Sequence, residues 1–187
     1  MKPKTMALSD AVSLVAWGYL FLYLNINLGP VDVLPNWLGY GMMLRALPAL
    51  GSAVPAAALL RPLASMLAGW QGLLWVLPIL GIPTTGPVVS LLALVFGVVG
   101  IYFHFQLLTN LAEAAQQRAF PDEKPLLRLR TVNTLLVTLF ALPVAWADYP
   151  VPSLVLALVG IVVGLWICVT LFHLRNHLQQ GEKSQAG

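Results

Sequence analysis

Four polar side chains that could together hold a ligand by hydrogen bonds occur within a short stretch of this chain: Asn25, Asn27, Asp32 and Asn36. The residues around them are mostly apolar, with glycine and proline between them. Polar groups in an apolar environment must face a protein interior, a water-filled vestibule or lipid headgroups, because uncompensated burial is costly. The alternative role is local, in which Asp32 or Asn36 caps the helix that follows.

Arg45 is a basic residue within an apolar run, about 13 Å along a helix from Asn36. An ionisable group at such depth is by default a candidate for function, but its long stem can also carry the charge to the membrane interface. Both roles stay open. We expect a ligand-binding cavity that opens to the outer face, with Asp148 at its rim and five residues lining it: Asn25, Asn27, Asp32, Asn36 and Arg45.

The histidines give weaker signals. His173 and His177 stand four residues apart, a spacing that can chelate a metal, and His104 lies near the end of another apolar run. No further ligand completes an H-E-x-x-H motif, so we expect ordinary interfacial histidines and no metal site. The sequence also lacks a G-x-S-x-G element, a Walker-type glycine loop and a paired-Asp motif for phosphoalcohol transfer. We therefore expect a protein that is not an enzyme and needs no cofactor.

Composition determines which elements must position these residues. Of 187 residues, 59% are hydrophobic and only 9% are charged, whereas soluble domains carry roughly 25% charged residues. High hydrophobicity also excludes a disordered chain. At about 20 residues for each crossing, the length suits six transmembrane helices and little else.

Apolar runs predict an all-α fold, an integral membrane bundle of six transmembrane helices arranged as helical hairpins in a single domain. The second helix should be short or kinked, because Arg45 and Pro48 interrupt it. A Ser9-Asp10 pair is a candidate cap for the first helix. The expected spans are residues 9–28, 33–53, 60–82, 87–108, 129–147 and 152–174, with a cytoplasmic loop over about 109–128.

Basic residues predict the orientation, since cytoplasmic loops collect Lys and Arg. With the N-terminus inside, all ten fall on the cytoplasmic side: Lys2, Lys4, Arg45, Arg61, Arg118, Lys124, Arg128, Arg130, Arg175 and Lys183. The outer loops then carry only Asp32 and Asp148. We expect a multi-pass protein of the bacterial cytoplasmic membrane with both termini in the cytoplasm.

The fourth helix should continue past the membrane until Pro121, because polar and apolar residues alternate at helical spacing there. The basic and apolar residues of 124–130 suit anionic headgroups, although topology alone would produce the same composition. Membrane lipids are thus expected partners, and segment 109–130 is a candidate surface for a cytoplasmic protein. Lys and Arg are scattered singly, so nucleic acid is not expected.

A weak repeat relates the third and fourth spans to the fifth and sixth, with Pro78 and Pro87 corresponding to Pro143 and Pro152. Small residues lie at helical spacing in both halves, and they allow helices to approach closely in lipid. They are Ala93, Gly97 and Gly100 in the fourth span and Ala157, Gly160 and Gly164 in the sixth. Packing within one subunit and a homo-oligomer face are the two interpretations.

Residues 31–40, Val-Asp-Val-Leu-Pro-Asn-Trp-Leu-Gly-Tyr, resemble a pattern in uncharacterised bacterial small multi-pass membrane proteins. In that family Asp-Ile-Leu-Pro-Asp-Phe-Ile-Gly-Tyr follows the first span. The resemblance covers about the first 45 residues and departs at Asn36 and Trp37, where Asp and Phe are common. It implies membrane topology and a defined turn, without a substrate.

The leading interpretation is a non-catalytic membrane protein that binds a small ligand from the outer face. A small transporter, or the substrate-binding membrane subunit of one, is the first alternative. Six helices, about 190 residues and internal termini are similar to the substrate-binding subunits of energy-coupling-factor vitamin transporters, although the first span lacks their alanine-x-x-x-alanine stripe. The second alternative is a scaffold or regulator that acts through residues 109–130.

Overall fold

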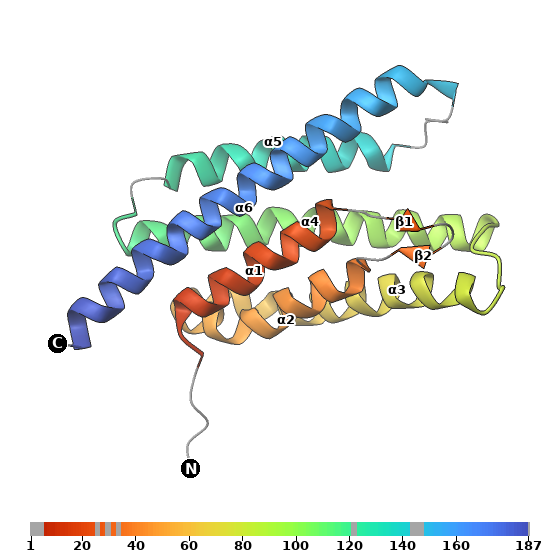
Figure 1. The fold of residues 1–187 in the computed structure, drawn as a ribbon. Coiled ribbons are helices and arrows are strands. Elements are labelled where there is room, and N and C mark those ends of the chain that lie inside the picture. The colour runs from red at the N-terminus through yellow and green to blue at the C-terminus, as the bar shows by residue number, and fades with distance from the viewer. Residues whose placement is uncertain are drawn as a thin grey trace, which may run out of the picture.

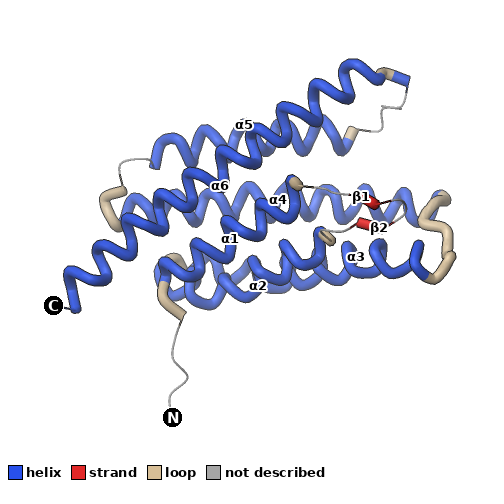
Figure 2. The backbone as a smooth tube through the Cα atoms, viewed as in Figure 1, coloured by secondary structure: helices blue, strands red, loops and turns tan. Residues whose placement is uncertain are grey.

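The structure is a computed structural model, and it describes residues 6–24, 27–28, 31–32, 35–120, 123–142 and 148–186. Within these ranges the side chains of residues 27, 28, 31, 32, 123 and 183–186 are not described. The fold is all-α apart from one two-residue hairpin (Figures 1 and 2). The class predicted from the apolar runs is therefore confirmed at this level.

Six α-helices and a 3₁₀ helix make up the described structure. They are α1 (Leu8–Tyr23), α2 (Asn36–Ala53), η1 (Pro55–Leu60), α3 (Arg61–Ile79), α4 (Pro87–Gln117), α5 (Glu123–Ala141) and α6 (Pro150–Ala186). Between α1 and α2, β1 (Asn27–Leu28) pairs antiparallel with β2 (Val31–Asp32). Each range expected to span the membrane is thus occupied by one helix.

Three helical stretches are long and apolar enough to cross a membrane: Pro55–Ile79, Pro87–Gln117 and Pro150–Glu182. The other helices of the described chain differ in length or charge. α1 is apolar but has 16 residues, about 24 Å of helix. α5 carries Lys124, Arg128 and Arg130 in its first half. Length and composition therefore support three membrane spans among the described helices.

The helices form a closed ring, because each packs on the next along the chain and α6 packs back on α1. The molecule has two ends (Figure 1). The terminal end holds the start of α1, the α2–η1 connection, the end of α4, the start of α5 and the end of α6. The hairpin end holds the β1–β2 hairpin, the α3–α4 turn and the start of α6. Ser9 near the start of α1 donates to the Glu182 carboxylate near the end of α6, 2.8 Å away, which ties the two termini together.

The hydrophobic core lies in the half of the ring nearer the terminal end. Its fully buried leucines include Leu50, Leu60, Leu107, Leu126 and Leu171, which come from five different helices. In the other half, α4 and α6 expose large apolar side chains such as Val88, Leu91, Leu154 and Leu158. Contiguous exposed apolar surface of this kind is typical of a membrane-facing protein.

Helix ends follow local rules with two departures from expectation. Pro87 begins α4, and Pro150, rather than Pro152, begins α6; proline suits a first turn, where its missing N–H has no helical partner. Pro78 lies one residue before the end of α3, and Pro143 lies outside the described residues.

The prediction that Ser9 and Asp10 cap the first helix was wrong. Ala7 is the N-cap of α1 and makes no side-chain hydrogen bond, while Ser9 bonds to Glu182.

α4 runs without interruption for 31 residues, about 46 Å, which exceeds the roughly 30 Å hydrocarbon layer. It ends in a Schellman motif, in which the Phe120 N–H donates to the Ala115 carbonyl and the Ala119 N–H to the Gln116 carbonyl. Ala119 has a φ of 53° there. The ring of Phe120 packs on His177, whose Nε2–H donates to the Arg118 carbonyl at 3.2 Å.

Candidate functional site

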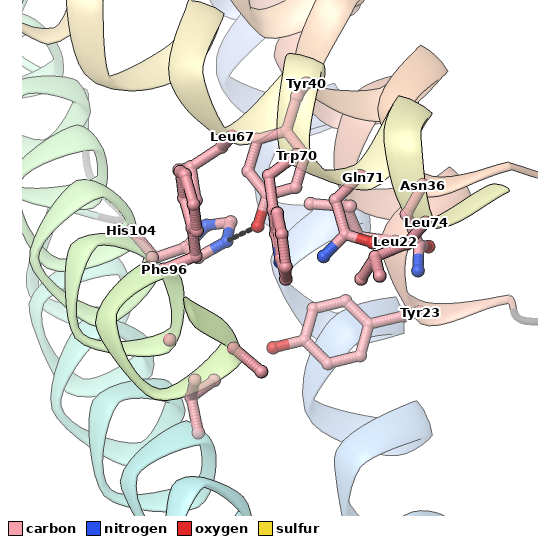
Figure 3. A pocket seen from close by; sticks show the side chains of 14 residues that line it. Leu22, Tyr23, Asn36, Tyr40, Leu67, Trp70, Gln71, Leu74, Phe96 and His104 are labelled. Carbon is pink, nitrogen blue, oxygen red and sulfur yellow. Dashed lines mark hydrogen bonds between the residues drawn. The ribbon is translucent and has the colours of Figure 1, made fainter. Parts of the chain in front are cut away.

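A cavity of about 370 Å³ lies among α1 to α5 (Figure 3). Its walls are Leu22 and Tyr23 of α1; Asn36 and Tyr40 of α2; Leu67, Trp70, Gln71 and Leu74 of α3; Ala93, Phe96, Gly97, Gly100 and His104 of α4; and Val137 of α5. Small-molecule sites usually measure about 300–1,000 Å³ and combine apolar walls with a few polar groups. None of the described lining residues is Asp, Glu, Lys or Arg, so the wall carries no formal charge when His104 is neutral.

His104 lies between two buried tyrosines. Its Nε2 is 3.1 Å from the Tyr40 hydroxyl, and its Nδ1 is 3.3 Å from the Tyr19 hydroxyl. A neutral imidazole donates from one nitrogen and accepts at the other, so one tyrosine donates to the ring and the other accepts from it. This pairing joins α1, α2 and α4. Of the three residues, Tyr40 and His104 line the cavity.

The interfacial role expected for His104 was wrong. The residue is buried midway along α4, and its two partners come from α1 and α2. The sequence around His104 does not indicate these partners, because Tyr40 and Tyr19 are 64 and 85 residues away along the chain.

An aromatic pair forms the apolar wall. The rings of Trp70 and Phe96 are stacked, with centroids 4.7 Å apart and planes inclined by 6°. In Figure 3 the ring of Trp70 stands between His104 on one side and the amides of Gln71 and Asn36 on the other. A ligand in the cavity would therefore meet aromatic carbon flanked by hydrogen-bonding groups.

Asn36 was predicted from the sequence as a ligand-binding residue, and it lines the cavity. It is the first residue of α2, whose N-cap is Pro35, and it makes no capping bond. Its Oδ1 atom is buried and accepts no hydrogen bond within the part of the chain that the structure describes. An acceptor without a partner at a cavity wall is a place where a ligand donor gains a hydrogen bond, since leaving it empty is costly.

Tyr23 also lines the cavity. Its hydroxyl donates a hydrogen bond to Oδ1 of Asn133, a buried residue of α5. The ring of Tyr23 lies against the Cα of Gly164 on α6, where an added Cβ atom would overlap it. Tyr23 thus links α1 with α5 and α6 and closes the cavity on that side.

The chain matches no model of a known protein family, no curated protein and no solved structure.

Of the remaining predicted ligand-binding residues, the structure describes the side chains of Arg45 and Asp148, and neither lines this cavity. Asn25 lies outside the described residues, and Asn27 and Asp32 are opposite each other in the β1–β2 ladder without described side chains. Asp148 is exposed near the start of α6 and does not line the cavity.

Arg45 is exposed on α2 and is absent from the cavity wall, so the hypothesis that it faces the ligand needs correction. The buried residues Met43, Ala46 and Leu47 occupy the inward positions around it. Helical spacing then turns Arg45 outward, where its stem can reach the interface.

The two groups of small residues behave differently. Ala93, Gly97 and Gly100 line the cavity, and a Cβ atom at Gly97 would find nothing within 4 Å. Gly97 thus leaves open space rather than the close helix approach that the spacing suggested, whereas a Cβ atom at Gly100 would lie 3.8 Å from Leu67. Gly160 and Gly164 lie beside Leu136 and Tyr23 of the same chain, whereas Ala157 is exposed.

Five aromatic or polar residues of the cavity wall were not predicted as site residues from the sequence: Tyr23, Tyr40, Trp70, Gln71 and Phe96. One signal was available for Gln71, because a glutamine in the middle of an apolar run is unusual. Aromatic residues in membrane spans are common, so their convergence could be recognised only in three dimensions. Among described residues no group of three or more His, Cys, Asp or Glu could hold a metal.

Proposed function

We propose that this chain is a multi-pass integral membrane protein whose six helices all cross the bacterial cytoplasmic membrane, with both termini in the cytoplasm. Three long apolar stretches support the membrane setting. The alternation of connections between the two ends supports an even number of crossings. The segregation of basic residues away from the hairpin-end loops supports the orientation.

Within this setting we propose that the protein binds a small uncharged ligand in the cavity among α1 to α5. The observation that carries this proposal is the buried Asn36 Oδ1, which lacks a hydrogen-bond partner in the described chain and belongs to the cavity wall. Asn36 begins the helix that follows the hairpin, so this acceptor lies toward the hairpin end of the cavity, which is the outer side in this topology.

The wall chemistry restricts the ligand class. Amide, hydroxyl and imidazole groups can exchange hydrogen bonds with a neutral polar molecule, and Trp70 and Phe96 offer an aromatic surface to its apolar part. A charged ligand would lose its hydration without gaining an opposite charge from any described lining residue. Binding without covalent chemistry is thus the function that this arrangement favours.

Thermal unfolding of the detergent-purified protein tests the proposal. The probes are three uncharged compounds, nicotinamide, uracil and benzyl alcohol, each paired with a charged counterpart: nicotinate, orotate and benzoate. A compound that binds the folded state stabilises it by about 2.7 kcal/mol at 100 times its Kd. We expect at least one uncharged probe to raise the melting temperature while its charged counterpart does not.

The Asn36→Leu variant separates cavity binding from general solvent effects. It keeps a side chain of similar size but removes the acceptor, so the shift produced by the active probe should disappear. A matched control is Ser52→Ala, because Ser52 is exposed near the other end of α2 and bonds only to a carbonyl within its own helix. Equal shifts in Asn36→Leu and the parent protein, or no shift with any uncharged probe, would refute ligand binding in this cavity.

A further inference from the structure

A second hollow lies on the outside of the bundle, between the first half of α4 and the end of α5. It measures about 760 Å³, and its walls include Leu91, Leu94, Phe140 and Ala141. Leu91, Leu94 and Phe140 are 62%, 50% and 42% exposed. In the six-span arrangement this groove faces the hydrocarbon of the bilayer, because the surrounding part of α4 belongs to one of the three long apolar stretches.

The outer groove and the inner cavity meet at two residues. Ala93 and Gly97 belong to the walls of both. Their side chains are a methyl group and a hydrogen atom, and a Cβ atom added at Gly97 would find no atom within 4 Å. The wall between the cavity and the bilayer is therefore as thin at this point as side chains allow.

The two hollows differ in chemistry. Asn36, Gln71, Tyr40 and His104 supply hydrogen-bonding groups to the inner cavity, whereas the groove contributes chiefly carbon. A molecule that fills both must carry a compact polar head on a hydrocarbon chain. Its head must be uncharged and must donate a hydrogen bond, because the cavity wall has no formal charge and offers the unpartnered acceptor Asn36 Oδ1.

We infer that the ligand is an uncharged single-chain amphiphile with a hydroxyl-bearing head, such as a monoacylglycerol, which reaches the cavity sideways from the bilayer. The head lies among Asn36, Tyr40 and His104. The chain passes Gly97 and Ala93 and lies in the groove along α4 and α5. This inference rests on the proposed ligand-binding function and adds the class of ligand and its access route.

Photocrosslinking in phosphatidylcholine nanodiscs tests it. The probe is a monoacylglycerol with a diazirine in its acyl chain, and crosslinked peptides are mapped by mass spectrometry. We expect crosslinks in residues 87–97 of α4 and 137–141 of α5. Unlabelled monoolein should compete. Methyl oleate, which has the same chain but no donor, and oleate, which is charged, should compete about tenfold less well, since one hydrogen bond corresponds to about a factor of ten in affinity.

Gly97→Leu tests the access route. The open space beside Gly97 lets the variant fold, while the leucine fills the junction, so crosslinking should fall at least tenfold. Gly69→Leu is the matched control, because a Cβ atom at Gly69 also meets nothing within 4 Å and Gly69 lines neither hollow. Melting temperatures report whether each variant is folded, and Ala93→Leu provides a second obstruction should Gly97→Leu fold poorly.

The outcomes separate the two proposals. Unchanged crosslinking in folded Gly97→Leu and Ala93→Leu, or equal competition by methyl oleate and monoolein, overturns the amphiphile inference. If nicotinamide, uracil or benzyl alcohol still stabilises the protein through Asn36, the cavity function stands without it. If Asn36→Leu changes neither the small-probe shift nor the crosslinking, both fail.

Discussion

Gly18 of α1 and Gly39 of α2 lie against each other's backbone. A Cβ atom on Gly18 would stand 2.8 Å from the Gly39 carbonyl oxygen, and one on Gly39 would stand 2.7 Å from the Gly18 carbonyl oxygen. This mutual contact sets the distance between α1 and α2 and so positions Tyr19 and Tyr40, the neighbours of these glycines, on either side of His104.

Replacing either glycine by alanine should separate the two helices. Overpacking of this kind costs about 1–3 kcal/mol, because both obstructing atoms belong to the backbone. We expect Gly18→Ala and Gly39→Ala to lower the free energy of unfolding in detergent by that amount. Gly41→Ala on α2 is the control, since its Cβ atom meets nothing within 4 Å; equal destabilisation by all three variants would contradict the close approach.

Tyr40→Phe should destabilise the protein by about 1–3 kcal/mol, because His104 Nε2 is left buried without its partner. Tyr102→Phe is the control on α4, since Tyr102 is 56% exposed and should change stability by less than about 0.5 kcal/mol. Unfolding by a denaturing detergent measures both. Similar stabilities for the two variants would show that the hydrogen bond to His104 contributes nothing.

Ala119→Gly should stabilise the end of α4. Ala119 has a φ of 53° at the Schellman position, a conformation that costs an L-residue with a Cβ roughly 1–2 kcal/mol and that glycine adopts freely. We expect a gain of about 1 kcal/mol in the free energy of unfolding. Ala119→Val, which is β-branched, should shift the melting temperature the other way, and a loss of stability in the glycine variant would refute the assignment.

His177→Ala should lose the bond to the Arg118 carbonyl and the ring contact with Phe120. The cost should be about 1 kcal/mol, because the carbonyl belongs to the end of a helix, where partners are scarce. His173→Ala, one turn earlier on the exposed side of α6, should be neutral in the same melting experiment. If His173→Ala lowered the stability more than His177→Ala, the contact between His177 and the end of α4 would not be the stabilising one.

Labelling with a membrane-impermeant maleimide in intact cells tests the orientation. Cys168 is buried and is replaced by serine to remove background. A cysteine introduced by Asp148→Cys should react from outside, whereas one introduced by Gln117→Cys should react only after the membrane is opened, since these exposed residues lie at opposite ends of the molecule. Reversed labelling would invert the topology and place the Asn36 end of the cavity toward the cytoplasmic side.

Local information in the sequence determined where the helices lie. Apolar runs and prolines place a helix in each of the six expected ranges, and Pro87 begins its helix as predicted. Basic residues alone also predict an orientation, which the maleimide labelling tests. These features depend on residues that are close together along the chain, so they can be recognised from the sequence alone.

The tertiary structure alone decided what each side chain faces. Gly97 and Gly164 have the same side chain and similar spacing motifs, yet one opens a cavity and the other receives the ring of Tyr23. Arg45 and His104 both interrupt apolar runs, but α2 turns Arg45 outward while two distant tyrosines hold His104 inside. The reason is physical: helical periodicity defines faces, and only the packing of other helices decides which face is buried and by what.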